Sequence, residues 1–242
     1  MTEQAMQNEG QGPESQSGLP GTFITFEGGE GVGKTTHIQI LAAHLTAAGL
    51  DVVCLREPGG TQISEKIRQI LLDSQNAEIS VRTELLLYEA ARAQLVTERI
   101  LPSLQKGVTV LCDRYLDSTI AYQGYGRGLP LSLVEEANRL GSLGLMPTRT
   151  VLLVDDWEQA LRRARLQGAD RLEAQNLDFH RRVNEGFLEL AAQNPKRIRR
   201  VFLQDDAQST ADLVFQAVSD LFGEKAMGVY QIPEQLLKDL SV

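Results

Sequence analysis

Five short apolar runs, rich in β-branched residues, alternate along this chain with longer segments of helical spacing. The runs occupy residues 22–26, 52–56, 108–112, 151–154 and 198–203. Their almost continuous apolar character is typical of strands that are covered on both faces, as in a parallel sheet. We therefore predict an α/β fold with a five-stranded parallel sheet and helices on both faces. Ligands of such folds gather at the carboxyl ends of the strands.

Two helices and one loop stand out between these strands. Residues 80–101 have the periodicity of a long helix, and we expect this helix to stop before Pro102. Residues 132–140 predict another helix. The preceding segment, 124–130, is rich in glycine and tyrosine, and we expect it to form a mobile loop.

The two ends of the chain differ from the middle. Residues 1–20 are rich in Gln, Glu, Gly and Ser and contain neither Lys nor Arg. We expect a disordered tail there and not a secretory signal, which needs a basic start and an apolar core. Residues 223–242 are predicted to form a C-terminal tail. This division leaves one domain over residues 21–222, in which no stretch approaches the ~18 apolar residues of a membrane-spanning helix.

Charge and cysteine usage narrow the possible partners. The formal net charge is −8, whereas a protein that binds nucleic acid or a membrane surface generally needs a basic face. We therefore expect neither partner. Cys54 and Cys112 both lie inside apolar runs, which favours two small buried side chains over a disulfide. Reduced cysteines agree with a cytoplasmic location.

The first apolar run leads directly into Gly-x-x-x-x-Gly-Lys-Thr at residues 28–35. Glycines allow successive backbone N–H groups to surround phosphate oxygens, and the N-terminus of a following helix favours the same anion. Lys34 adds a positive charge, and Thr35 adds a hydroxyl ligand for Mg²⁺. A glycine-rich turn that matches the motif by chance is the alternative, but the strand before it and the helical spacing after it favour a P-loop NTPase. The expected nucleotide contacts are Gly28, Gly29, Glu30, Gly31, Val32, Gly33, Lys34, Thr35 and Thr36.

Charged residues also follow two other strands at the same edge of the predicted sheet. Asp113 ends the run 108–112, where a P-loop fold places a carboxylate that holds magnesium. Arg114 comes next, and its guanidinium can bridge two phosphates. The alternative for Asp113 is a turn or helix-cap residue, and the alternative for Arg114 is a surface ion pair. Glu57 lies in the Pro- and Gly-rich turn after the second run, and with Arg68 it is expected beside the phosphates, unless this turn is only a connector.

Two further groups have competing interpretations. Tyr88 and Arg92 are four residues apart and so share a helix face, which suits a planar heterocycle. From spacing alone, ordinary packing of Tyr88 and solvation of Arg92 explain the pair better.

Residues 162–175 carry Arg162, Arg163, Arg165 and Arg171 around Gly168. They suit a mobile lid that closes over a phosphoryl group, and the alternative is a solvated basic helix face.

Together these motifs resemble the bacterial thymidylate kinases. The likeness runs from about residue 21 to 222 and includes Phe-Glu-Gly-Gly-Glu-Gly-Val-Gly-Lys-Thr-Thr at 26–36, Arg-Glu-Pro-Gly-Gly-Thr at 56–61, Ala-Ala-Arg-Ala-Gln at 90–94, Asp-Arg-Tyr at 113–115, Asp-Ser-Thr-Ile-Ala-Tyr-Gln-Gly-Tyr-Gly-Arg-Gly at 117–128, Asp-Arg-Leu-Glu at 170–173 and Phe-His-Arg-Arg-Val at 179–183. The resemblance implies a P-loop nucleoside monophosphate kinase that transfers a phosphoryl group from ATP, with Mg²⁺, to deoxythymidine monophosphate (dTMP). It also implies a homodimer.

The resemblance further implies a role for individual residues. Lys34 and Arg114 handle the transferred phosphoryl group, and Glu57, Arg68 and Arg114 position the acceptor phosphate. The base is expected to stack on Tyr88, to accept a hydrogen bond from Arg92 and to contact Thr119 and Gln123.

Because its phosphate loop contains an acidic residue, Glu30, the chain resembles those relatives that take their catalytic arginine from the lid. Arg165 and Arg171 are our candidates, although relatives have a further arginine near Gln167, and Arg163 stays open as well.

Other functions remain to be weighed against this one. A kinase for another nucleoside monophosphate or a small metabolite has the same phosphate loop. A GTP-dependent switch does too, but the chain lacks the Asn-Lys-x-Asp motif that reads guanine. A nucleotide-binding protein without catalytic activity is a further alternative, which loss of turnover in Lys34→Ala would exclude.

Overall fold

A computed structural model describes residues 18–166, 168 and 170–223. Five parallel strands form one sheet in the order β2-β3-β1-β4-β5. Their bounds are β1 Phe23–Glu27, β2 Val52–Arg56, β3 Thr109–Asp113, β4 Arg149–Val154 and β5 Ile198–Phe202. The predicted five-stranded parallel sheet is thereby confirmed, and each strand lies within two residues of its predicted position.

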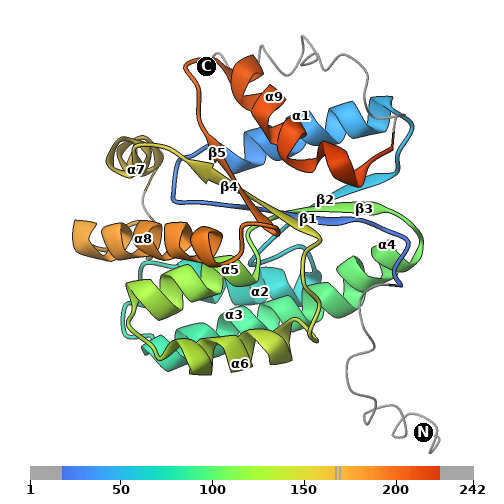
Figure 1. Ribbon diagram of the computed structural model, residues 1–242. Coiled ribbons are helices and arrows are strands. Elements are labelled where there is room, and N and C mark those ends of the chain that lie inside the picture. Colours follow the sequence, from blue (N-terminus) through green and yellow to red (C-terminus); the bar gives the residue numbers. More distant parts are fainter. Residues whose placement is uncertain (1–17, 167, 169, 224–242) are drawn as a thin grey trace, which may run out of the picture.

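Helices cover both faces of this sheet (Figure 1). On one face lie α1 Lys34–Ala47 and α9 Ala207–Val218, followed by the short helix η4 Ser219–Leu221. On the other face are α2 Gln62–Leu72, α3 Val81–Leu95, η2 Val96–Ile100, α4 Leu101–Gln105, α5 Leu116–Thr119, η3 Ile120–Gly126, α6 Leu131–Gly141 and α8 Leu177–Gln193. Helix α7 Trp157–Arg165 lies beyond the carboxyl end of β4.

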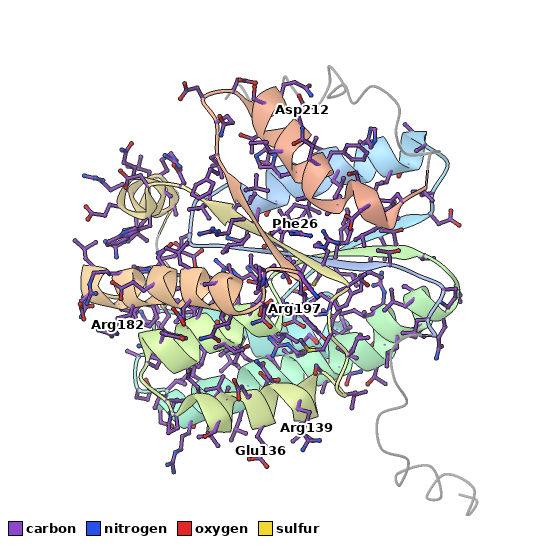
Figure 2. All side chains as sticks on the ribbon, in the orientation of Figure 1. Phe26, Glu136, Arg139, Arg182, Arg197 and Asp212 are labelled. Carbon is purple, nitrogen blue, oxygen red and sulfur yellow. The ribbon has the colours of Figure 1, made fainter. Side chains whose placement is uncertain are left out.

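The strand β1 is the centre of the fold. It pairs with β3 on one side and β4 on the other, and all five of its residues are buried. Phe26 is fully buried in the core between the sheet and helices α1 and α9, whereas Glu136 and Arg139 lie on the exposed side of α6 (Figure 2). The central position of β1 brings the loop that follows it to the middle of the carboxyl edge of the sheet.

The long helix does not stop before Pro102, contrary to the prediction. It begins after Ser80 as expected, with the Ser80 hydroxyl accepting from the Thr83 N–H over 3.2 Å. After Leu95 the chain passes through the π-helical turn η2 and continues as α4 to Gln105. Pro102 lies at the start of α4, directly after the π-helical turn, where the interruption of the α-helical hydrogen-bond pattern accommodates a residue without an N–H.

Two of the three glycines of the predicted loop 124–130 allow close packing of helices. Gly124 and Gly126 belong to η3, and only the residues after them connect to α6. A Cβ at Gly126 would lie 2.7 Å from a ring carbon of Phe179, so this glycine allows η3 to approach α8 closely. Composition alone does not separate such packing glycines from turn glycines.

Burial corrects two further expectations. Cys112 is buried as predicted, but Cys54 is exposed, because it lies on the edge strand β2.

Leu19 packs against the core near Phe23, so the packed chain starts before residue 21. The rest of the predicted N-terminal tail, 1–17, and most of the C-terminal tail, 224–242, lie outside the described residues. Within the described ranges, none of the helices has both the length and the apolar character needed to cross a membrane.

Candidate active site

The phosphate loop connects β1 to α1, as the motif predicts. Gly31 and Gly33 have φ angles of 69° and 77°, a left-handed conformation that side chains with a Cβ rarely adopt. A Cβ at Gly31 would also lie 2.1 Å from the carbonyl oxygen of Ala160, so α7 packs directly on this loop. The Lys34 ammonium reaches back over the loop and donates to the carbonyls of Gly28 and Gly29 over 3.3 and 2.7 Å.

Two neighbouring cavities lie at the carboxyl edge of the sheet. The first has a volume of about 280 Å³ and is lined by Glu30, Gly31, Gly33, Lys34, Thr35, Thr36, Arg56, Glu57, Arg68, Asp113 and Arg114. We call it the donor cavity. The fold therefore brings together the phosphate loop, the turn after β2 and the end of β3, which the sequence predicted to share one edge.

The second cavity adjoins the first and has a volume of about 150 Å³. We call it the acceptor cavity. All seven residues predicted to contact the acceptor line it: Glu57, Arg68, Tyr88, Arg92, Arg114, Thr119 and Gln123. Four residues, Glu30, Glu57, Arg68 and Arg114, line both cavities.

Arg114 lies at the junction of the two cavities in an unusual backbone conformation, with φ of 65°. Its guanidinium donates to the Gly28 carbonyl over 3.0 Å, forms an ion pair with Glu30 at 2.8 Å and lies 5.0 Å above the centre of the Tyr122 ring. These contacts hold a permanent positive charge where the cavities meet. Burial alone would raise the pKa of Glu30, but Arg114 and Lys34 outweigh it and lower this pKa to about 2.

Lys34 and Asp113 complete the donor side. Burial and the neighbouring Arg114 lower the pKa of Lys34 to about 8. The Thr35 hydroxyl donates to Asp113 Oδ2 over 2.7 Å, so the two predicted magnesium ligands lie side by side. Both are oxygen donors, the type that Mg²⁺ prefers.

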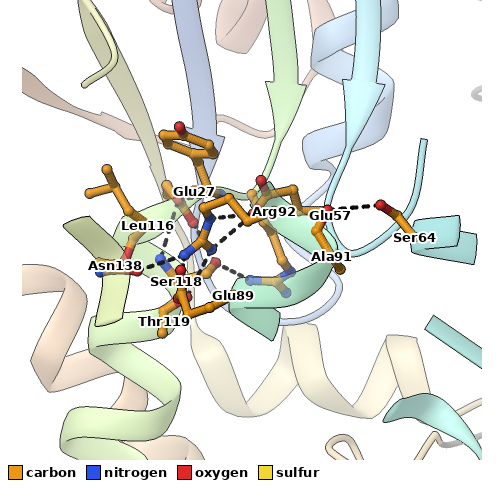
Figure 3. A network of polar contacts seen from close by, with 12 residues as sticks. Glu27, Glu57, Ser64, Glu89, Ala91, Arg92, Leu116, Ser118, Thr119 and Asn138 are labelled. Carbon is orange, nitrogen blue, oxygen red and sulfur yellow. Dashed lines mark hydrogen bonds and ion pairs between the residues drawn. The ribbon is translucent and has the colours of Figure 1, made fainter. Parts of the chain in front are cut away.

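Arg92 lines the acceptor cavity and belongs to a buried polar network (Figure 3). Its Nε and Nη2 both lie 2.8 Å from Glu57 Oε2, its Nη1 donates to Glu89 and Asn138 over 2.6 Å each, and its Nη2 donates to Thr119 over 2.8 Å. All three guanidinium nitrogens therefore have protein acceptors: four of the five N–H groups form hydrogen bonds, and Nη2 also forms an ion pair with Glu57. Solvation, the alternative considered from spacing, is thus wrong for Arg92.

The charged groups around Arg92 are buried with it. Burial raises the pKa of Glu57 to about 7, against the opposing effect of Arg92 and with a further contribution from Glu89. The second oxygens of Glu57 and Glu89 have no hydrogen-bond partner within the described part of the chain. The network therefore depends on Arg92 for its charge balance.

The lid arginines differ sharply in their surroundings. Arg165 donates to the carbonyls of Glu173 and Gln175 over 2.6–2.9 Å. Arg171 is buried and forms an ion pair with Glu84 at 2.6 Å. Neither lines the donor or the acceptor cavity. Arg163 is half exposed, pairs with Asp155 at 2.5 Å and approaches the Gly31 carbonyl at 3.4 Å.

Several residues of the site were missed from the sequence. Tyr122, Asp170 and Glu173 line the acceptor cavity, although the first lies between Thr119 and Gln123 and the others flank Arg171, so proximity in sequence was an available signal. Glu27, the last residue of β1, is buried and accepts from the Tyr115 N–H over 2.8 Å and from the Ser118 hydroxyl over 2.5 Å. No spacing rule indicates that buried carboxyl group, because its partners follow β3 and are 88 and 91 residues away in the chain.

A phosphate loop with a donor cavity that opens onto a separate acceptor cavity defines a P-loop kinase for a small phosphorylated acceptor. Comparisons with known proteins identify the family. A profile of the thymidylate kinase family matches residues 26–214. The thymidylate kinase of Caldanaerobacter subterraneus is 44% identical over 202 residues, covering 84% of this chain and 97% of that protein. For the thymidylate kinase of a Geobacter species the identity is 47% over 205 residues, with coverage of 82% and 91%.

A solved structure leads to the same family. The crystal structure of thymidylate kinase from Ehrlichia chaffeensis matches with a TM-score of 0.67 at 32% identity, over 82% of this chain and 98% of that one. This chain therefore belongs to the thymidylate kinase family, the nucleoside monophosphate kinases that phosphorylate dTMP with ATP. The resemblance noted from the motifs is thereby confirmed.

Proposed function

We propose that this chain transfers the terminal phosphoryl group of ATP to dTMP and releases ADP and dTDP at the junction of the two cavities. The observation that carries the proposal is that Glu30, Glu57, Arg68 and Arg114 line both cavities. A nucleotide on the phosphate loop and a monophosphate in the acceptor cavity meet at these residues. Positioning in line and charge stabilisation then suffice for direct transfer, without a covalent enzyme intermediate.

Lys34 and Arg114 are the proposed catalytic cations. Lys34 lies over the phosphate loop, and Arg114 is fixed between the cavities by Gly28 and Glu30. Both charges are in place before charge develops on the transferred group, which is the condition for electrostatic catalysis. Glu57 and Arg68 line the same junction and are proposed to position the acceptor phosphate.

Thr35 and Asp113 are proposed to hold Mg²⁺ beside the donor phosphates. Their hydroxyl and carboxylate oxygens lie 2.7 Å apart, and Mg²⁺ usually takes one or two protein carboxylates, with water and substrate phosphates as its other ligands. The ion would neutralise negative charge on the transferred phosphoryl group.

The base is proposed to stack on Tyr88 and to meet Thr119 and Gln123 at its edge. The sequence had also predicted a direct bond from Arg92 to a base carbonyl. Because all three guanidinium nitrogens of Arg92 already have protein acceptors, we propose that Arg92 acts on the base through Thr119 as well. A direct bond that displaces one of these partners would cost about 1–3 kcal/mol.

The lid is proposed to supply a catalytic arginine from Arg165. The carbonyl groups that hold its guanidinium belong to residues 173 and 175, and Glu173 lines the acceptor cavity. Arg171, the other candidate, is proposed to anchor the lid to α3 instead, because its guanidinium is buried against Glu84.

A homodimer and a cytoplasmic location complete the proposal. Apolar side chains are exposed on three helices that pack side by side: Ile70 on α2, Leu86 on α3 and Leu140 on α6 are 45–75% exposed. Patches of this kind are typical of protein interfaces. Light scattering should give the mass of two chains for the parent and of one chain for Leu86→Glu, and a parent of one-chain mass would overturn the dimer.

The decisive experiment for the activity is ADP production from ATP and Mg²⁺ with each nucleoside monophosphate in turn, beside Lys34→Ala. We expect a strong preference for dTMP that disappears with Lys34. If only a different monophosphate is phosphorylated, dTMP is refuted as the acceptor, whereas the proposed transfer mechanism is retained. No activity with any acceptor would refute the proposal altogether.

A further inference from the structure

Thr119 and Gln123 are four residues apart and both line the acceptor cavity. Each of them has a buried partner that can take only one role, donor or acceptor, in the hydrogen bond between them. For Thr119 the partner is Arg92, whose Nη2 donates to Thr119 Oγ1 over 2.8 Å. A guanidinium has no acceptor, so the Thr119 oxygen accepts. Its own hydrogen is left to donate to a ligand.

For Gln123 the partner is Glu84 on α3. Gln123 Nε2 donates to Glu84 Oε1 over 2.8 Å. Glu84 also accepts from Arg127 at 2.9 and 3.1 Å and pairs with Arg171 at 2.6 Å. Burial alone would raise the pKa of Glu84, but Arg127, Gln123 and Arg171 outweigh it, and the net shift is downward. Glu84 is thus an ionised carboxylate.

The charge of Glu84 decides which end of the Gln123 amide faces it. An ionised carboxylate can only accept hydrogen bonds, so the amide nitrogen must face Glu84. The amide oxygen then lies on the opposite side and is available to accept from a ligand. Thr119 and Gln123 therefore offer a donor and an acceptor in a fixed order.

We propose that Glu84 is a positioning residue which, together with Arg92, sets this donor–acceptor order and thereby selects 4-keto over 4-amino pyrimidine monophosphates. The inference rests on the proposed function. Thymine presents a carbonyl oxygen at position 4 beside an N–H at position 3, and this edge complements Thr119 and Gln123. Cytosine presents an amino group beside a bare nitrogen, so the Gln123 oxygen would meet the lone pair of this nitrogen, acceptor against acceptor. Uracil presents the same edge as thymine, so this device does not separate dTMP from dUMP.

The test compares kcat/KM for dTMP, dUMP and dCMP in the parent and in Glu84→Gln. An amide at position 84 can donate to the Gln123 oxygen, which allows the Gln123 amide to turn around. We expect the dTMP to dCMP ratio to fall by about tenfold or more, since a buried polar site discriminates against a ligand edge that leaves one of its groups unpaired. The dTMP to dUMP ratio should stay constant. A merely structural defect would lower all three values together and leave both ratios unchanged.

Two further variants complete the experiment. Arg127→Gln removes another partner of Glu84 but leaves the contact with Gln123, so its dTMP to dCMP ratio should match the parent. Gln123→Leu removes the amide and leaves the two arginine contacts of Glu84, so it should lower that ratio even if Glu84→Gln fails to fold. The inference is overturned if Gln123→Leu, or a folded Glu84→Gln, retains the parent ratio. A parent that is inactive with dTMP would instead refute the proposed function, and the inference with it.

Discussion

The Nε of Arg92 donates to Oε2 of Glu57 over 2.8 Å, although the two residues are 35 positions apart in the chain. Arg92 comes from α3 and Glu57 from the turn after β2, and the pair is almost completely buried. The same contact joins the acceptor cavity to the donor cavity, because Glu57 lines both cavities and Arg92 lines the acceptor cavity. The proposed sites for the base and for the acceptor phosphate are thus joined by one buried charge network.

Replacement of Arg92 by Met should therefore destabilise the whole domain. It leaves the Glu57 and Glu89 carboxylates buried without their cation, and the loss of one partner from a buried pair costs about 3–5 kcal/mol. Urea unfolding at pH 8 measures this loss, and at pH 5 the loss should be smaller because Glu57, whose pKa burial raises to about 7, is protonated there. Arg82→Met, at an exposed position of the same helix, is the control. An Arg92→Met protein as stable as this control would contradict the prediction.

The activity should fall at alkaline pH because of Lys34. Its pKa is lowered to about 8 in the protein without nucleotide, and a neutral amine does not attract phosphate. We expect kcat/KM for ATP to be constant below this pH and to decrease above it, since this parameter reports the free enzyme. Lys34→Arg keeps its charge across the range, and its profile should lack the decrease. A parent profile that is flat from pH 7 to about 9.5 would refute this role of the ammonium.

Stability should decrease as the pH rises from about 5 to 8, with a contribution from Glu27. Burial and the neighbouring Asp117 raise the pKa of Glu27 from 4.5 to about 8. Between these values the folded state binds a proton that the unfolded state has released, so stability is fully present below the lower pKa and is lost as the pH passes through the higher one. Glu27→Gln removes this titration.

Urea unfolding at several pH values between 5 and 8 measures the effect. The slope for Glu27→Gln should be smaller than that of the parent. Some slope should remain, because burial also raises the pKa of Glu57 to about 7. Equal slopes in the parent and in Glu27→Gln would show that Glu27 titrates normally.

The lid prediction distinguishes Arg165 from its neighbours. A catalytic arginine can contribute about 10³–10⁵ in rate to phosphoryl transfer, so Arg165→Ala should lower kcat by about a hundredfold or more. Arg162→Ala, in the same helix and 72% exposed at its side chain, should retain the parent rate. Single-turnover measurements with dTMP test both. If Arg163→Ala shows the large loss and Arg165→Ala does not, the arginine that contacts the phosphate loop is the catalytic one.

The sequence by itself determined the features that depend on local pattern. The five strands, the phosphate loop and the edge of the sheet at which the charged residues meet all follow from short-range periodicity and from the rule that parallel strands end together. The motifs were specific enough to indicate the family that the comparisons confirm. The resemblance carried by these motifs also supplied seven of the residues that line the acceptor cavity.

Only the tertiary structure decided what each side chain contacts. Cys54 is exposed because β2 is an edge strand, and Arg171 is buried because α3 places Glu84 beside it. All three guanidinium nitrogens of Arg92 have acceptors because four separate segments supply them. Burial and charge balance are sums over neighbours that are distant in the chain, so no local pattern contains them. The hydrogen-bond order at Thr119 and Gln123 has the same origin.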